Sequence, residues 1–137
     1  MSSDNYSEKV SVNINSSTLS AIDLLVDNGY YSNRSDFINQ ALRESLRLHQ
    51  STVDRIVERN MKKTTGDDQW FLGVFGLTSR EVEELYAEGE SFRLRGYGVL
   101  HISADCDEEK LKAVVKSVSI RGKVFAPDWV KQHYGVK

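Results

Sequence analysis

One strictly alternating segment near the N-terminus constrains this chain more than any other feature. Residues 9–15 place apolar side chains on one face of an extended strand and polar side chains on the other. The apolar face consists of Val10, Val12 and Ile14, and the polar face of Lys9, Ser11, Asn13 and Asn15. The patterns that follow are helical, so the strand has no neighbour to pair with. A strand and two helices of about 45 residues bury too little surface to fold alone. The economical solution is a homodimer in which two such strands pair antiparallel.

Two helices are expected after this strand. The first has Asn15, Ser16 or Ser17 as its candidate N-cap and stops at Asn28-Gly29, because glycine tolerates the left-handed conformation that ends helices. The second starts within residues 32–36, where Asn33 can cap and Asp36 lies in the first turn. The apolar pattern continues beyond His49, which predicts either one long helix or a separate helix over roughly residues 51–63.

The polar face of a paired ribbon has the chemistry to read DNA. A two-stranded ribbon fits the major groove. In both chains, Lys9, Ser11 and Asn13 would project from the face opposite the helices. Asparagine can bind adenine through two hydrogen bonds, lysine can donate to guanine, and serine can pair with either. We therefore expect these three residues to contact base edges.

Residues 9–49 resemble the ribbon-helix-helix family of DNA-binding regulators, of the Arc/MetJ/CopG type. The most specific stretch is residues 29–43, where a Gly-Tyr turn precedes Asn-Arg-Ser-Asp and then Ile38 and Ala41-Leu42 at helical spacing. The resemblance implies a prokaryotic homodimer that inserts its ribbon into the major groove of double-stranded DNA. It also implies that the second helix points its N-terminus at a phosphate, which suits free amides and the helix dipole. By position, base reading belongs to Lys9, Ser11 and Asn13, and phosphate binding to Ser32, Asn33, Arg34 and Ser35.

Composition limits the other function classes. The formal net charge is -2 and no apolar run approaches the ~20 residues of a membrane-spanning helix. Residues 1–64 balance to zero charge, so positive charge for DNA must be sorted onto one face of this half. The single cysteine, Cys106, excludes an internal disulfide framework and a multi-cysteine zinc site, and it fits a reducing compartment. With no secretory signal pattern at the N-terminus, we expect a cytoplasmic protein without membrane contact.

The second half reads as a separate α+β domain. The expected order is strand, helix, strand, strand, helix, strand, with a hairpin around Gly96-Tyr97-Gly98, which suggests a βαββαβ module of ferredoxin-like or ACT-like type. No tandem repeat is evident. The expected organisation is a flexible tail over 1–8, the ribbon-helix-helix domain over 9–50, a connecting helix and linker over 51–69, and an oligomerisation or sensing domain over 70–137.

The second half shows no marked site for chemistry. Its place after a ribbon-helix-helix segment is similar to that in the nickel-responsive regulators of the family, which use several histidines and a cysteine. This chain has His101 and Cys106 but no His-x-His pair, so we predict no metal site. No Ser/His/Asp, Cys/His or paired-carboxylate arrangement has motif support, so we predict neither an enzyme nor a cofactor. The aromatic residues of this half are read as core or subunit interface.

These observations predict a sequence-specific DNA-binding regulator, a homodimer or tetramer, with repression as the family default. Two alternatives remain open. One is an antitoxin-type protein that binds its own operator and neutralises a partner protein through its second half. The other is a regulator that responds to a metal or metabolite in that half. The sequence does not name an operator, an effector or a protein partner.

Overall fold

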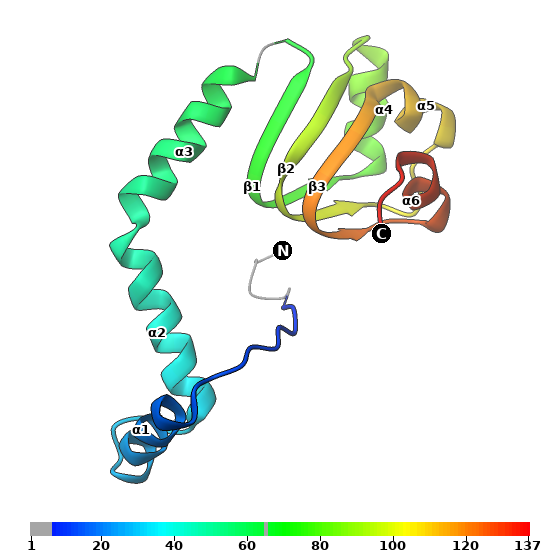
Figure 1. Cartoon of the computed structure of the whole chain (residues 1–137). Coiled ribbons are helices and arrows are strands. Elements are labelled where there is room, and N and C mark those ends of the chain that lie inside the picture. Colours follow the sequence, from blue (N-terminus) through cyan, green and yellow to red (C-terminus); the bar gives the residue numbers. More distant parts are fainter. Residues whose placement is uncertain (1–6, 65) are drawn as a thin grey trace. The chain divides into compact units, whose positions relative to one another are not determined.

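A computed structural model describes residues 7–64 and 66–137 of the chain (Figure 1). The chain divides into two compact units, Ser7–Arg55 and Ile56–Lys137. The first holds α1 (Ser16–Asp27), α2 (Arg34–Leu48) and the start of α3 (Gln50–Lys63). The second holds the rest of α3 and then β1 (Asp68–Leu77), α4 (Ser79–Ala87), β2 (Phe92–Ile102), α5 (Glu108–Val114), β3 (Val115–Phe125) and α6 (Asp128–Tyr134). None of the described helices is long and apolar enough to cross a membrane.

Both helices of the N-terminal unit begin at a capping asparagine, as expected. The Asn15 side chain accepts a hydrogen bond from the Ser17 amide at 2.9 Å, which satisfies one of the free donors at the start of α1. Asn33 does the same for the Asp36 amide of α2 at 2.8 Å. The continuing pattern after His49 forms a separate helix, α3, rather than one long helix. α3 crosses the boundary between the two units.

The segment expected to be a strand, residues 9–15, carries no strand in the single chain. A strand is defined by hydrogen bonds to a neighbour, and the described part of the chain offers this segment no pairing partner. Val10 is 77% exposed and Val12 is 70% exposed, so the apolar face is left open to water. The paired ribbon therefore stays a prediction about the dimer. Most of the expected flexible tail, residues 1–6 of 1–8, lies outside the described residues.

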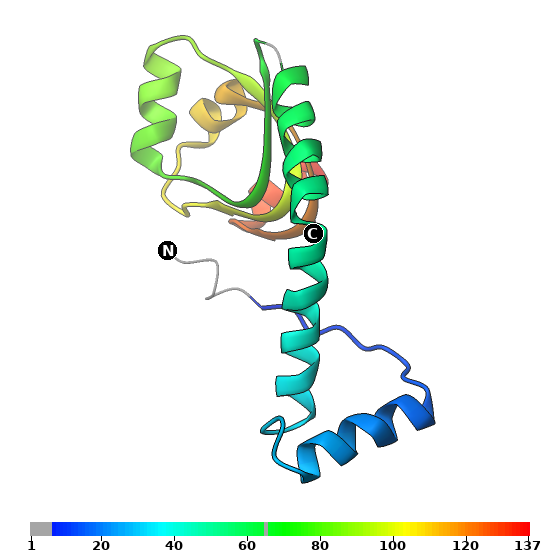
Figure 2. The ribbon, with the colours of Figure 1, turned by 90° about the vertical axis from the view of Figure 1, so that its left-hand side faces the viewer.

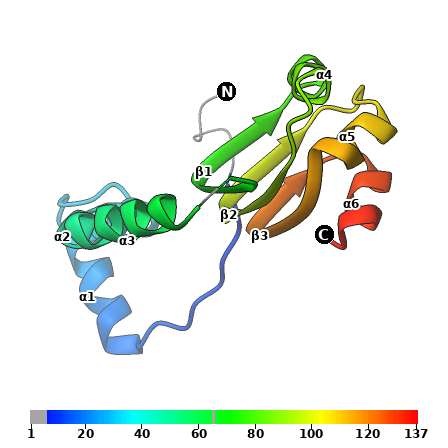
Figure 3. The ribbon, with the colours of Figure 1, turned by 90° about the horizontal axis from the view of Figure 1, so that it is seen from above.

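In the C-terminal unit, the described strands form one sheet in which β1, β2 and β3 are neighbours in chain order and all parallel. Each crossover between neighbouring parallel strands takes the same hand, so successive crossovers that advance in one direction place their helices on one face. Figures 2 and 3 show α4, α5 and α6 together on that face. The core lies between the two layers, with Leu94 and Leu100 of β2 against Val82 and Leu111 of the helices.

The hairpin predicted around Gly96-Tyr97-Gly98 is wrong, because these residues lie inside the continuous strand β2. The alternating order of strands and helices, with all strands parallel, also replaces the expected ferredoxin-like or ACT-like βαββαβ arrangement. The coarser expectation of an α+β protein is confirmed. The linker is shorter than expected, since Asp68 and Gln69 already belong to β1.

Three glycines at one register position explain why a turn-like sequence remains a strand. Gly73, Gly98 and Gly122 are aligned across β1, β2 and β3, with φ angles of +119°, +133° and +147°. All three strands therefore adopt the same unusual backbone conformation at this level, and the ladder continues through it. The glycines recur about every 25 residues, together with one strand and one helix each. The unit is thus a structural repeat, although its sequence shows little self-similarity beyond these positions.

A tyrosine side chain links the last helix, α6, to strand β3. The Tyr134 hydroxyl donates a hydrogen bond to the Val115 carbonyl at 2.6 Å, and burial raises the pKa of this hydroxyl to about 12. Val130 of α6 is buried in the same core. α6 therefore closes the helical layer over β3.

The glycine register predicts that Gly98→Ala destabilises the C-terminal unit strongly. A Cβ at Gly98 would lie 1.9 Å from the Gly73 carbonyl oxygen, in a backbone conformation that alanine rarely adopts. We expect the free energy of unfolding to fall by more than ~3 kcal/mol, measured by urea denaturation.

Gly89→Ala is the matched control. Its φ is also positive, at +72°, but no atom lies within 4 Å of the added Cβ. A loss of about 1 kcal/mol is expected there. Equal losses at the two positions would show that the backbone conformation, and not the close approach of the strands, limits residue 98.

Candidate nucleic-acid interface

The three residues predicted to read bases lie on the N-terminal segment that precedes α1. Lys9, Ser11 and Asn13 are all exposed, and they alternate with Val10, Val12 and Ile14. Only Ile14 of that second group is partly buried in the single chain. The structure therefore leaves the three polar side chains open to solvent, while their pairing into a common surface requires a second copy.

The N-terminus of α2 carries the four residues predicted to bind phosphate. Asn33 caps the helix, and Asp36 accepts a hydrogen bond from the Ser32 amide at 2.9 Å. The Asn33 side chain binds the Asp36 amide, and the Asp36 side chain binds the Ser32 amide. Together these two hydrogen bonds fix the direction in which the helix starts. The amides of Arg34 and Ser35 have no acceptor among the residues that the structure describes. These two donors, at the positive end of the helix dipole, are available to an anion.

Asp36 places a negative charge beside these free amides. Hydrogen bonds from the Gln40 side chain and from the Ser32 amide lower the pKa of its carboxyl, so Asp36 is ionised at neutral pH. This charge stabilises the start of α2 through the helix dipole. The same charge repels a second anion at the start of α2. A phosphate there would therefore be held by the amides of Arg34 and Ser35 together with nearby positively charged side chains.

Arg34 is not free in the single chain. Its Nε and Nη2 donate to the two carboxylate oxygens of Asp23 in α1, each at 2.8 Å. This two-pronged contact ties the first turn of α2 to α1. Arg34 and Asp23 keep 57% and 40% of their side-chain surface exposed, so the pair is accessible and screened by solvent. The sequence did not indicate Asp23 as a partner, because the contact depends on how the turn at Gly29 folds the helices back.

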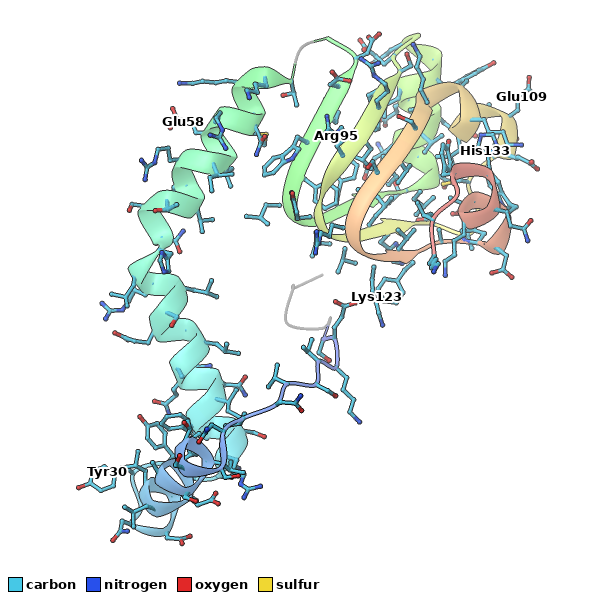
Figure 4. All side chains as sticks on the ribbon, in the orientation of Figure 1. Tyr30, Glu58, Arg95, Glu109, Lys123 and His133 are labelled. Atoms are coloured by element: carbon cyan, nitrogen blue, oxygen red, sulfur yellow. The ribbon has the colours of Figure 1, made fainter. Side chains whose placement is uncertain are left out.

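The N-terminal unit also exposes an apolar stripe on α2. Leu42 and Leu46 keep 57% and 62% of their surface in contact with water, and every residue from 41 to 50 is exposed. Among the described residues of this unit, Ile22 is the one buried apolar side chain. Tyr30 projects outward in the turn between α1 and α2 (Figure 4). A unit that buries so little apolar surface is not stable as a monomer.

His101 and Cys106, the two residues compared with a metal-binding set, differ in their surroundings. The described residues contain no group of three or more potential metal ligands. His101 is exposed on β2, whereas Cys106 is buried. Burial raises the pKa of the Cys106 thiol, and the nearby Asp105 and Glu81 carboxylates add to this effect. Cys106 is therefore held as a neutral thiol, which is a poor nucleophile and a poor metal ligand.

A family model for a ribbon-helix-helix transcriptional regulator family matches residues 5–131 of the chain. The match covers the two helices, the segment before them and most of the C-terminal unit. Comparisons with the curated proteins and with the solved structures gave no match.

Because Arg34 of α2 contacts Asp23 of α1, we expect the titration of the Asp23 carboxyl to report on this contact. The hydrogen bonds from Arg34 hold the pKa of the Asp23 carboxyl below its ordinary value. A lowered pKa means that the pair contributes to stability above the unfolded-state pKa, and that this contribution is lost as the pH falls through the folded-state pKa. In Arg34→Gln, the pKa of Asp23 should rise toward its ordinary value, measured by NMR of side-chain carboxyl groups.

The same titration on the unaltered chain is the reference. An unchanged Asp23 titration in the variant would show that the two helices do not keep this contact in solution.

Proposed function

The chain belongs to the ribbon-helix-helix transcriptional regulator family, and we propose that it regulates transcription by inserting a two-stranded ribbon into the major groove of an operator. Regulators of this family bind DNA and act as dimers, and the family is one of regulators rather than enzymes. In this proposal two copies pair residues 9–15 antiparallel, and repression follows from occupancy of promoter DNA.

The observation that carries the proposal is the open apolar surface of the N-terminal unit. Val10, Val12, Leu42 and Leu46 are exposed in one chain, and they lie on the segment and helix that a ribbon-helix-helix dimer would bury. Full burial of such a side chain contributes roughly 1.5–3 kcal/mol. Pairing of two copies therefore supplies both the missing core and the missing strand partner, and a monomer supplies neither.

The polar side chains of the same segment account for sequence-specific DNA recognition in this proposal. Pairing through Val10, Val12 and Ile14 places Lys9, Ser11 and Asn13 of both chains on the outer face of the ribbon. Their hydrogen-bonding groups match those at base edges in the major groove. The free amides at the start of α2 would hold phosphates on either side and so set the register of the ribbon.

In this proposal, Arg34 leaves Asp23 when DNA binds. An exposed ion pair of this kind is worth little, whereas a DNA phosphate offers the guanidinium a two-pronged acceptor of the same charge, and binding it releases counterions condensed on the DNA. Arg34 would then exchange a carboxylate for a phosphate when DNA binds. In this interpretation Asp23 competes with the phosphate for the arginine.

The antitoxin-type alternative has less support. An antitoxin tail commonly orders only on its partner protein, whereas residues 66–137 form a sheet with its own apolar core. That core supports a module that folds without a partner protein, and the role proposed for it is assembly or sensing. A metal-responsive role finds no group of ligands among the described residues.

Selection of binding sites from a random pool of DNA duplexes tests the proposal. We expect a recovered motif with two-fold symmetry or with short tandem half-sites, because the reading surface is made by two copies. Recovery of no motif, with weak and salt-sensitive binding only, would contradict base reading by the ribbon.

On the recovered site, Asn13→Ala should cost roughly 1–3 kcal/mol of binding free energy, and the preference should relax at one base position per half-site. Gel-shift titrations against the site and its single-base variants measure this. Gln132→Ala, on the exposed surface of α6, is the matched control and should change nothing. An equal loss for every DNA sequence would assign Asn13 to a structural role.

Arg34→Ala should weaken binding to all sequences alike, and the slope of log affinity against log salt should fall by about one unit. Asp23→Asn should do the reverse and strengthen binding, because it releases the guanidinium. Arg80→Ala on α4 is the control for loss of a surface arginine. An unchanged slope in Arg34→Ala would remove Arg34 from the phosphate contacts.

A further inference from the structure

In the C-terminal unit, the face of the sheet opposite α4, α5 and α6 is largely exposed. Along each strand, alternate side chains point to this outer face, and most of them are exposed. Leu72 of β1 is 53% exposed and Tyr97 of β2 is 50% exposed. Parallel sheets are ordinarily covered on both faces, so this surface is unusual and calls for an occupant.

A polar hollow lies on this outer face. It encloses about 250 Å³, close to the lower end of the range for small-molecule sites. Six side chains with hydrogen-bonding groups or rings line it, namely those of Asn60, Trp70, Arg95, Tyr97, Ser119 and Arg121. Figure 4 shows Arg95 on the sheet, away from His133 and Glu109 of the helical layer. The hollow is therefore separate from the apolar core of the C-terminal unit.

Two arginines of the hollow form no ion pair within the described part of the chain. Arg93, on the same face of β2, is paired with Asp68 at 2.8 Å. Among the residues that the structure describes, no carboxylate lies within ion-pair distance of Arg95 or Arg121. The two are diagonal neighbours on adjacent strands, because Arg95 is level with Ser119 and Arg121 is level with Tyr97. Two adjacent, unpaired guanidinium groups form a binding site for an oxyanion, above all a phosphate.

Two aromatic rings lie beside these charges. The ring centroids of Trp70 and Tyr97 are 6.3 Å apart, and the planes are inclined by 63°. Trp70 is level with Arg95 across the β1–β2 pair. The core of this unit is filled by other side chains, so neither ring is needed there. Half-exposed rings next to arginines are the surface on which proteins stack planar bases.

We propose that this hollow binds a nucleotide, with its base against Trp70 and Tyr97 and its phosphate between Arg95 and Arg121. The Ser119 hydroxyl is placed to donate a hydrogen bond to the same phosphate. A second copy of this face is a poorer occupant, because an isologous contact would bring four unpaired arginines together. A long single strand of nucleic acid needs a run of stacking positions, whereas this face offers one ring pair beside one pair of unpaired arginines.

The test is a titration of the full chain with the mono- and diphosphates of adenosine, guanosine, cytidine and uridine. Trp129→Phe leaves Trp70 as the sole tryptophan, so stacking of a base is read as quenching of its fluorescence. Calorimetry on the unaltered chain measures the same affinity without that substitution. We expect at least one nucleotide to bind with a sub-millimolar Kd, and both adenosine and inorganic phosphate to bind at least tenfold more weakly.

In this titration, Arg95→Gln and Arg121→Gln should each weaken binding at least tenfold. Arg80→Gln, an exposed arginine of α4 on the opposite layer, is the matched control and should bind as the unaltered chain does. Circular dichroism confirms that each variant is folded. DNA binding is not the readout, so the outcome does not depend on the function proposed for the N-terminal unit.

Three results would overturn the proposal. The first is the absence of binding by all eight nucleotides at millimolar concentration. The second is equal binding of inorganic phosphate and nucleotides, which would make the hollow a simple anion site. The third is binding of single-stranded oligonucleotides, sensitive to Arg95→Gln, without binding of the mononucleotides.

Discussion

The pairing of neighbouring parallel strands in chain order decides the rest of the C-terminal unit. Because each crossover has the same hand and the sheet grows in one direction, the helices must gather on one face. That face receives the apolar side chains and becomes the core. The other face carries rings, arginines and some exposed apolar side chains such as Leu72, and α4, α5 and α6 do not cover it. The same topological constraint therefore produces both the stable part of this unit and its open surface.

The N-terminal unit differs, because in the proposed dimer most of its stability comes from the pairing of two copies. Its helices begin at well-formed caps and are joined by the Arg34–Asp23 ion pair, yet Val10, Val12, Leu42 and Leu46 stay exposed to water. Local hydrogen bonds can shape such a segment, but they cannot replace burial of apolar surface. In the proposed dimer, formation of the reading surface and formation of the core are one event. A free monomer would then have little specific affinity for DNA.

Local chemistry could be predicted from the sequence, and long-range pairing could not. The caps at Asn15 and Asn33 are both present, since a cap depends on residues two or three positions away. The hairpin at Gly96-Tyr97-Gly98 was wrong because glycine serves turns and close strand contacts equally well. Only the neighbouring glycines, about 25 residues before and after, distinguish the two. The Asp23 partner of Arg34 and the outer-face hollow were missed for the same reason, because each requires the tertiary arrangement.

The two outer strands of the sheet differ in a way that bears on how the protein behaves when it is concentrated. β3 carries Lys116, Arg121 and Lys123, and like charges along an unpaired strand discourage other chains from adding to it. In β1, residues 70–77 contain no charged side chain, and within the described residues β1 pairs only with β2. Uncharged, aromatic-rich edges of this kind nucleate intermolecular sheets. The edge of β1 is therefore a place where strands of other molecules can add when the protein is concentrated, and whatever shields that edge also protects the regulator from aggregation.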